Sequence, residues 1–181
     1  MIRPPTVEVD RVVLVGFMGS GKTTVGSELA RLKGWDFLDM DHLIEERAGL
    51  SVAEIFRQRG EPSFRSEEAR LALEVAALQR HVIAAGGGAF AMPDTRSALQ
   101  GGAVTVWLEC SLETVLARIG KGEGRPLAAS RETIRKMFVE RESAYRLADL
   151  AVDASPEPGE VARRIAAALE ARGAWRPRPR G

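Results

Sequence analysis

The segment at residues 16–23 is the strongest constraint on the fold of this chain. It reads Gly-Phe-Met-Gly-Ser-Gly-Lys-Thr and matches the pattern G-x-x-x-x-G-K-[ST] in full. The run at 11–15 before it is short, apolar and rich in β-branched residues, which predicts a buried strand. The residues at 22–33 after it carry apolar side chains at helical spacing, which predicts a helix. A glycine-rich loop between a strand and a helix points backbone N–H groups at an anion, so the segment predicts a phosphate-binding site.

The chemistry of phosphate binding explains each residue type in this loop. Glycines allow the positive φ angles and the close backbone approach that a bound phosphate requires. We expect Lys22 to reach the β- and γ-phosphates of a nucleotide and the Thr23 hydroxyl to bind Mg²⁺. The alternative is a chance glycine-rich turn with a surface lysine. The first interpretation assigns nucleotide binding to Gly19, Ser20, Gly21, Lys22, Thr23 and Thr24.

Segments typical of strands and helices alternate along the rest of the chain. Further strands are predicted at 35–38, 81–85, 103–108 and 150–153. Further helices are predicted at 41–48, 51–59, about 62–80, 111–119, about 131–147 and 159–171. In the helix at 22–33 we expect Val25, Leu29 and Leu32 to face the core. The alternation predicts an α/β fold with a parallel sheet covered on both faces, in which ligands bind beyond the carboxyl ends of the strands.

The composition limits the partners and the compartment of the chain. With 181 residues we expect a single domain. The formal net charge of +1, from 26 basic and 25 acidic residues, gives no overall attraction to nucleic acid or to a membrane surface. One cysteine cannot form an internal disulfide, which favours the cytoplasm. There is no apolar run of ~18 residues and no signal-peptide pattern, and we expect loose ends at 1–10 and about 173–181.

Two signatures are absent, and their absence narrows the class of nucleotide-binding protein. GTPases that read guanine carry Asn-Lys-x-Asp, and this chain contains no asparagine. Transporter ATPases carry Leu-Ser-Gly-Gly-Gln, which is missing as well. Both classes are therefore excluded, and the acid closest to the expected metal position is Asp39, at the end of the second predicted strand.

Three further places in the sequence predict an acceptor site. Asp39 and Asp41 lie where a strand becomes a helix, so one carboxylate can serve Mg²⁺ and the other an acceptor hydroxyl. The alternative is that Asp41 only caps the helix. The glycines at 86–88 would let the backbone approach a ligand, or they form an ordinary turn. The glycine-rich segment at 120–130 is either a lid that brings Arg125 to the phosphates or a flexible surface loop. Spacing alone does not separate the arginines at 65, 118 and 141 from solvated helix charge.

Taken together, these segments resemble the shikimate kinases over about residues 10–170. The matching segments in chain order are 16–26, Phe37-Leu-Asp-Met-Asp41, Ile44-Glu45 with Gly49, Ile55-Phe56, Gly60-Glu61, Phe64-Arg65 with Glu67-Glu68, Gly86-Gly-Gly88, Arg125-Pro126-Leu127, Arg141-x-x-x-Tyr145 and Ala148-Asp149. The resemblance implies a nucleoside-monophosphate-kinase-like fold with a five-stranded parallel sheet in the order 2-3-1-4-5. It also implies ATP- and Mg²⁺-dependent phosphorylation of the shikimate 3-hydroxyl, in the biosynthesis of chorismate and the aromatic amino acids.

The resemblance also implies a role for individual residues. Lys22, Asp41 and Arg125 would be catalytic, and Thr23 and Asp39 would hold the metal. Nucleotide binding would extend to Arg118, stacked on adenine, and to Arg125. The substrate site would comprise Asp41, Arg65, Gly86, Gly87, Gly88 and Arg141, with the two arginines on the substrate carboxylate. Residues 1–181 would form one monomeric kinase domain, with a core at about 10–171, a substrate-binding subdomain at about 41–70, a lid at about 120–130 and a tail at about 173–181.

The sequence departs from the family pattern in two places. Ala84 and Ala85 precede the triple glycine, where the family often has a hydroxyl that can reach the water shell of the metal. The loop at 154–159 lacks the basic residue that often lies near adenine. We expect both changes to affect ATP affinity more than the chemistry. Two alternatives stay open, namely a related small-metabolite kinase such as a gluconate kinase and a nucleotide-binding module without phosphoryl transfer.

Overall fold

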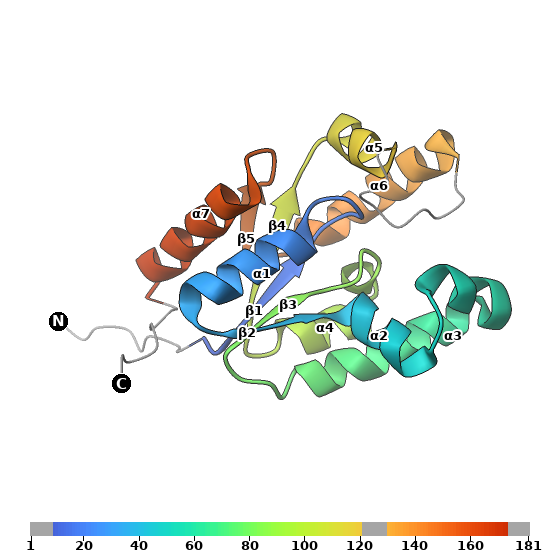
Figure 1. The fold of residues 1–181 in the computed structure, drawn as a ribbon, viewed down its shortest axis with the longest axis horizontal. Helices are drawn as coiled ribbons and strands as arrows, with labels where there is room; N and C mark the ends of the chain where they lie inside the picture. The colour runs from blue at the N-terminus through green and yellow to red at the C-terminus, as the bar shows by residue number, and fades with distance from the viewer. Residues whose placement is uncertain (1–8, 121–129, 174–181) are drawn as a thin grey trace.

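A computed structural model describes residues 9–120 and 130–173, and their centre is a five-stranded sheet (Figure 1). All four strand pairs are parallel, and the strand order is β2-β3-β1-β4-β5. The strands are β1 Arg11–Val15, β2 Asp36–Asp39, β3 His81–Ala84, β4 Val104–Glu109 and β5 Leu150–Asp153. The predicted α/β fold and its strand order are therefore confirmed.

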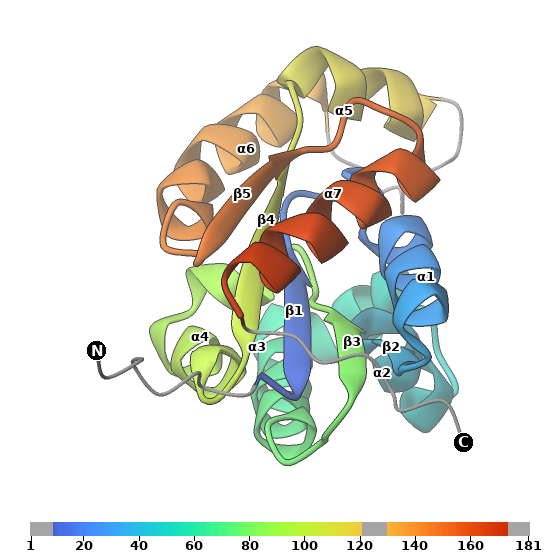
Figure 2. The same ribbon diagram turned by 90° about the vertical axis from the view of Figure 1, so that its left-hand side faces the viewer.

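Helices cover both faces of the sheet. They are α1 Lys22–Lys33, α2 Met40–Ala48, α3 Val52–Val75, the 3₁₀ turn η1 Ala89–Ala91, α4 Pro93–Gln100, α5 Leu112–Gly120, α6 Arg131–Tyr145 and α7 Pro158–Ala171. Helices α1 and α7 pack together on one face, and α3 and α4 pack together on the other (Figure 2). Helix α2 and the first part of α3 project from the sheet on one side, while α5 and α6 lie across from them (Figure 1). Among the described residues, no helix combines the length and the apolar composition needed to cross a membrane.

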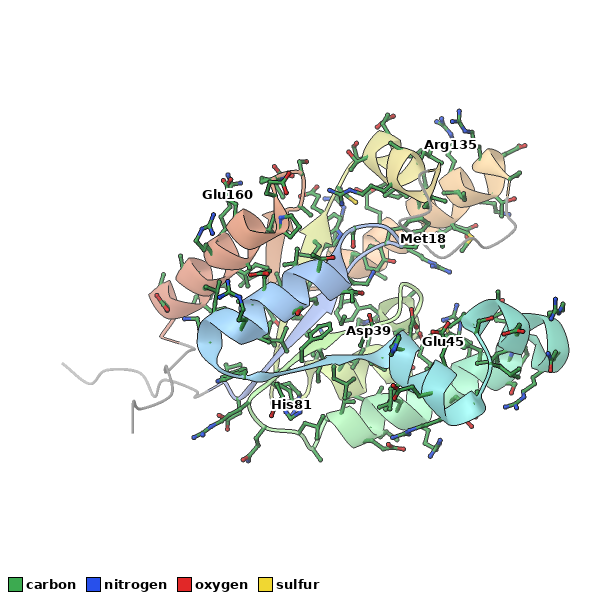
Figure 3. All side chains as sticks on the ribbon, viewed as in Figure 1. Met18, Asp39, Glu45, His81, Arg135 and Glu160 are labelled. Carbon is green, nitrogen blue, oxygen red and sulfur yellow. The ribbon has the colours of Figure 1, made fainter. Side chains whose placement is uncertain are left out.

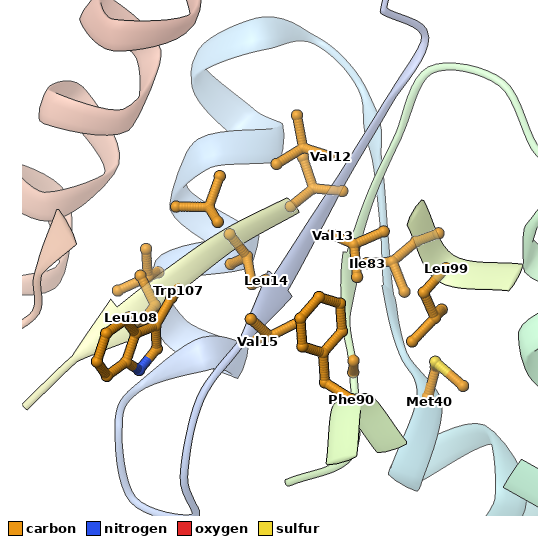
Figure 4. Close-up of a cluster of buried hydrophobic side chains, with 14 of the residues drawn as sticks. Val12, Val13, Leu14, Val15, Met40, Ile83, Phe90, Leu99, Trp107 and Leu108 are labelled. Atoms are coloured by element: carbon orange, nitrogen blue, oxygen red, sulfur yellow. The ribbon is translucent and has the colours of Figure 1, made fainter. Parts of the chain in front are cut away.

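The core lies where the central strands meet these helices. All five residues of β1 are buried, as expected for a parallel strand covered on both faces. Figure 4 shows its valines and Leu14 beside Ile83 of β3 and Leu108 of β4. Phe90 of η1 and Leu99 of α4 are buried in the same cluster. The packed centre holds the carboxyl ends of β1, β2 and β3 next to one another, because the three strands are paired in register.

The structure confirms Val25 and Leu29 in the core and corrects the place of Leu32, which is 41% exposed. Lys33 is buried beside Leu29 on this helix, so Leu32 lies at the edge of the buried face. Lys33 is buried against α7, where its ammonium pairs with Glu170. The buried face of α1 therefore includes a charged residue, Lys33, which a search for apolar side chains at helical spacing does not select.

The helices predicted at 51–59 and 62–80 both lie within α3, which is broken between them at Gly60. This residue, at φ 80° and ψ 163°, is not helical, so the chain kinks there, between the two predicted helices. Pro62 follows the kink at a position where a new helical turn starts. Helix α3 ends at Val75, five residues before the predicted end. Helix α4 had no counterpart among the predicted elements, because it is only eight residues long, is mostly polar and buries only Thr95 and Leu99.

Candidate active site

The loop between β1 and α1 has the geometry that its glycines predict. Gly19 and Gly21 have φ angles of 73° and 93°, in the left-handed region that residues with a Cβ rarely adopt. Gly21 is the N-cap of α1 and no side chain caps this helix end. The first N–H groups of α1 therefore point into the loop without a side-chain acceptor, which suits an anion.

The side chain of Lys22 folds back over this loop. Its Nζ donates hydrogen bonds of 2.9 Å to the carbonyl oxygens of both Gly16 and Phe17. Burial lowers the pKa of Lys22, and the nearby carboxylates of Asp41 and Asp39 act against that shift. The ammonium is thus held beside the glycine loop and faces two acids across the site.

Thr23 and Asp39 lie together, as the sequence predicts for a metal site. The Thr23 hydroxyl donates to Oδ2 of Asp39 at 2.6 Å. The other oxygen of Asp39 accepts from the backbone N–H of His42 at 3.2 Å, so Asp39 is the N-cap of α2 (Figure 3). Asp41 lies in the first turn of α2 and is not the cap. The alternative that Asp41 only caps the helix is therefore wrong.

An ion-pair cluster lies on α3 behind Asp41. The guanidinium of Arg65 donates from Nη1 to Glu68 Oε2 at 2.6 Å, and from Nε and Nη2 to Glu61 Oε1 at 3.2 and 3.1 Å. The Glu68 side chain is only 1% exposed, and its Oε1 has no hydrogen-bond partner in the part of the chain that the structure describes. Burial raises the pKa of Glu68, and the pairing with Arg65 opposes this shift. The resemblance implies that Arg65 binds a substrate carboxylate. In the structure its guanidinium already binds the carboxylates of Glu61 and Glu68.

The triple glycine packs against this cluster. A Cβ placed on Gly86 would lie 2.7 Å from Oδ1 of Asp41 and closer still to Oε1 of Glu68. A Cβ on Gly88 would overlap the guanidinium of Arg65. The glycines at 86 and 88 thus let the loop after β3 touch charged groups from α2 and α3, which an ordinary turn does not require.

One cavity of about 750 Å³ joins these groups. From the predicted site it is lined by Gly19, Gly21, Lys22, Thr23, Thr24, Asp39, Asp41, Arg65, Gly87, Gly88 and Arg141. Three predicted residues do not line it. Ser20 is buried under the loop, Gly86 lies behind Asp41, and Arg118 lies at the rim of the loop. Arg125 is outside the described residues.

Arg118 connects the phosphate loop to the last strand. Its Nη1 donates to the Gly19 carbonyl at 3.0 Å, and its Nη2 donates to the Ala154 carbonyl at 3.3 Å. The planar guanidinium is thereby held between the loop at 16–21 and the segment after β5. The resemblance to the shikimate kinases implies that the adenine ring lies at this guanidinium.

Comparison with known proteins agrees with this arrangement. A profile of the shikimate kinase family matches residues 18–170. A shikimate kinase of Moorella thermoacetica is 46% identical over 163 residues, which are 88% of this chain and 94% of that one. The chain belongs to the shikimate kinase family. Its function is accordingly that of a shikimate kinase, a phosphotransferase with an alcohol acceptor.

Solved structures of shikimate kinases share the fold of this family member. The shikimate kinase from Acinetobacter baumannii in complex with shikimate has a TM-score of 0.85 at 32% identity, covering 90% of this chain and 94% of that one. The shikimate kinase from Aquifex aeolicus has a TM-score of 0.78 at 35% identity, covering 89% of this chain and 96% of that one. A gluconokinase from Sinorhizobium meliloti, at 19% identity and a TM-score of 0.60, shares the fold alone.

Several residues of this shikimate kinase site were not predicted as part of it. Glu61 and Glu68 hold Arg65, and their spacing of four and three residues on one helix was the available signal. The cavity is also lined by the apolar side chains of Val52, Phe56, Phe64 and Met137. Apolar periodicity does not distinguish a cavity wall from the core, so no sequence signal identified these four.

Proposed function

We propose that this chain transfers the γ-phosphate of ATP, with Mg²⁺, to the 3-hydroxyl of shikimate. The observation that carries the proposal is the single cavity that joins a phosphate loop to a pair of arginines. Its volume of about 750 Å³ lies in the range of sites for small molecules. Cations at both ends suit a polyphosphate at one end and a carboxylate at the other.

At the nucleotide end, the proposed role of the protein is to position the phosphates of ATP and to neutralise their negative charge. Phosphoryl transfer needs positioning and neutralisation of negative charge more than covalent help from side chains. Lys22 and the N–H groups of the loop would bind the phosphates, and Ser20 and Thr24 complete the loop. Arg118 would lie on the adenine ring, since a planar guanidinium stacks well on an aromatic base.

The groups at Thr23 and Asp39 fit Mg²⁺. A hydroxyl and a carboxylate oxygen 2.6 Å apart are hard oxygen donors facing the cavity. No group of three or more metal-binding side chains occurs among the described residues, and Mg²⁺ does not need one, because it keeps water and phosphate oxygens as ligands. When bound, the ion would neutralise charge on the phosphates. Ala85 lines the cavity without a hydroxyl, so Thr23 and Asp39 would be the side chains that hold the ion.

At the acceptor end, we assign Arg65 and Arg141 to the shikimate carboxylate. Guanidinium groups pair with carboxylates through two parallel hydrogen bonds, which orients the ring as well as binding it. Asp41 would accept the proton of the attacking hydroxyl, and Lys22 stabilises its negative charge. The backbone at Gly86, Gly87 and Gly88 would approach the ring hydroxyls.

The proposed division of the chain follows these roles. We assign residues 1–181 to one kinase domain with its core at about 10–171, and residues 41–70 to substrate binding. Asp41, Arg65, Val52, Phe56 and Phe64 all line the cavity, which supports that assignment. The proposed lid at 120–130, with Arg125, and the tail at 173–181 lie almost wholly outside the described residues.

We further propose that the chain acts as a cytoplasmic monomer without a nucleic-acid or membrane partner. The formal net charge of +1 and the single cysteine support this. Light scattering coupled to size exclusion tests the monomer directly, and a mass of two chains would contradict it.

A coupled assay of ADP release tests the proposed reaction. We expect turnover with ATP, Mg²⁺ and shikimate, and only background release with gluconate or without an acceptor. Equal rates for all three would refute the assignment, and preference for gluconate would favour the related small-metabolite kinase. Asp41→Asn should lose most of kcat while the fold survives, whereas Asp36→Asn, an exposed strand residue outside the cavity, should keep it.

A further inference from the structure

Tyr145 is the one tyrosine of the chain and has no role in the site described so far. It ends α6 and is 3% exposed. Its hydroxyl donates a hydrogen bond to the carbonyl of Gly87, in the loop after β3, and the charged guanidinium of Arg141 lies near this hydroxyl. One buried phenol oxygen therefore connects a loop and a helix that both line the cavity.

The ring of Tyr145 is held independently of this contact. It packs on Trp107 of β4, with ring centroids 6.2 Å apart and an angle of 32° between the planes. Arg141 lies one helical turn before Tyr145, so both side chains point from the same face of α6. The guanidinium of Arg141 lies over the ring of Phe17 at 5.6 Å, and its Nη1 is 3.7 Å from the Cβ position of Gly87.

We propose that the hydroxyl of Tyr145 is a positioning group that sets the spacing between Arg141 and the Gly87 backbone for the acceptor. The inference rests on the proposed function, in which these two groups hold shikimate. Tyr145 does not itself line the cavity, so it acts through its two neighbours and is not a catalytic residue.

The chemistry of the phenol suits this task. Burial raises the pKa of Tyr145, and the charge of Arg141 opposes the shift only in part. The hydroxyl therefore stays protonated at neutral pH and keeps one proton to donate and lone pairs to accept. Removing it leaves the Gly87 carbonyl unsatisfied and breaks the hydrogen bond that joins the loop after β3 to α6, the helix that carries Arg141, while the ring and its packing remain.

Tyr145→Phe is the direct test, with KM measured for both substrates. We expect KM for shikimate to rise about three- to tenfold, the cost of one lost buried hydrogen bond, while KM for ATP changes less than about twofold. Thr105→Val is the matched control. It removes another fully buried hydroxyl, one that donates to Asp149 at 2.6 Å outside the cavity, so it should lower the melting temperature but leave both KM values unchanged.

The kinetic result has two outcomes that would overturn the inference. A wild-type KM for shikimate in Tyr145→Phe would show that the hydroxyl positions nothing. An equal rise in Thr105→Val would reduce the effect to general destabilisation.

A second measurement does not depend on turnover. Tyrosine labelled with ¹³C at Cζ gives a single NMR signal in this chain. We expect Arg141→Met to shift that signal and Arg135→Met to leave it in place, because Arg135 lies on the outer end of α6 and points away from the site (Figure 3). No shift in Arg141→Met would refute the Tyr145–Arg141 contact, whereas wild-type protein that fails to phosphorylate shikimate would refute the proposed function alone.

Discussion

Gly86→Ala tests whether the glycine loop, Asp41 and Glu68 are packed as closely as the structure shows. The added Cβ would lie 2.7 Å from Oδ1 of Asp41 and nearer to Oε1 of Glu68. An ordinary carbon–oxygen contact needs ~3.3 Å, so the Asp41 carboxylate must move by about 0.6 Å and that of Glu68 by more. The backbone of Gly86 itself has no positive φ, so the strain comes from these contacts alone.

The expected changes in stability and kinetics follow from the roles of the Asp41 and Glu68 carboxylates. A buried overlap of this kind costs about 1–3 kcal/mol of unfolding free energy. Misplacement of a catalytic group by ~1 Å can cost about 10²-fold in rate. We therefore expect kcat of Gly86→Ala to fall about 10- to 100-fold if Asp41 moves. If Glu68 moves instead, Arg65 moves with it, and KM for shikimate should rise.

The assay is ADP release at varied shikimate, with thermal melting alongside. Gly159→Ala is the matched control, because its Cβ would meet only Arg163 at an ordinary 3.6 Å within α7. That variant should be as stable as the wild type or slightly more stable, with unchanged kinetics. Wild-type kcat and KM in Gly86→Ala would show that the loop does not press on the two acids, and the packing argument would then be wrong.

Three other predictions use the same assays. Arg65→Ala should raise KM for shikimate far more than KM for ATP, because it removes a cation from the acceptor end, and equal changes in both would mean that Arg65 is misplaced. Asp39→Asn should raise the Mg²⁺ concentration needed for half-maximal rate by about tenfold, since an amide oxygen binds the ion more weakly than a carboxylate, and an unchanged requirement would count against Thr23 and Asp39 as the metal site. Burial raises the pKa of the Cys110 thiol, so a thiol reagent at pH 8 should label it slowly in native protein and rapidly in guanidinium; rapid native labelling would contradict its burial.

The fold was predictable to the extent that local patterns reported burial. The strand at 11–15 and the helix at 22–33 were predicted with the observed bounds, because the phosphate-loop motif connects them with strict spacing. The strand at 150–153 also has the predicted bounds, and the other predicted elements differ by one residue to a few residues. Leu32 was misplaced because Lys33 occupies the buried stripe and pairs across to α7, a long-range contact that no local window contains.

The arginines of the acceptor side were predictable only by resemblance, and the reason is physical. Arg65 and Arg141 lie far apart in the sequence and look like many other arginines on solvated helices. They line the same cavity because the parallel sheet brings the ends of β1, β2 and β3 to one edge, and because α3 runs past that edge after the kink at Gly60. Sequence spacing carries no information about such a meeting.

By itself the sequence determined the phosphate loop, because its function is a property of eight consecutive residues and of the strand and helix that hold them. The tertiary structure decided the rest of the site. It showed that Asp39 is the helix cap, so that Asp41 is not, that Arg65 bridges two carboxylates, and that Tyr145 connects α6 to Gly87. These contacts join residues that only folding brings together, and their distances follow from how the sheet and its helices pack.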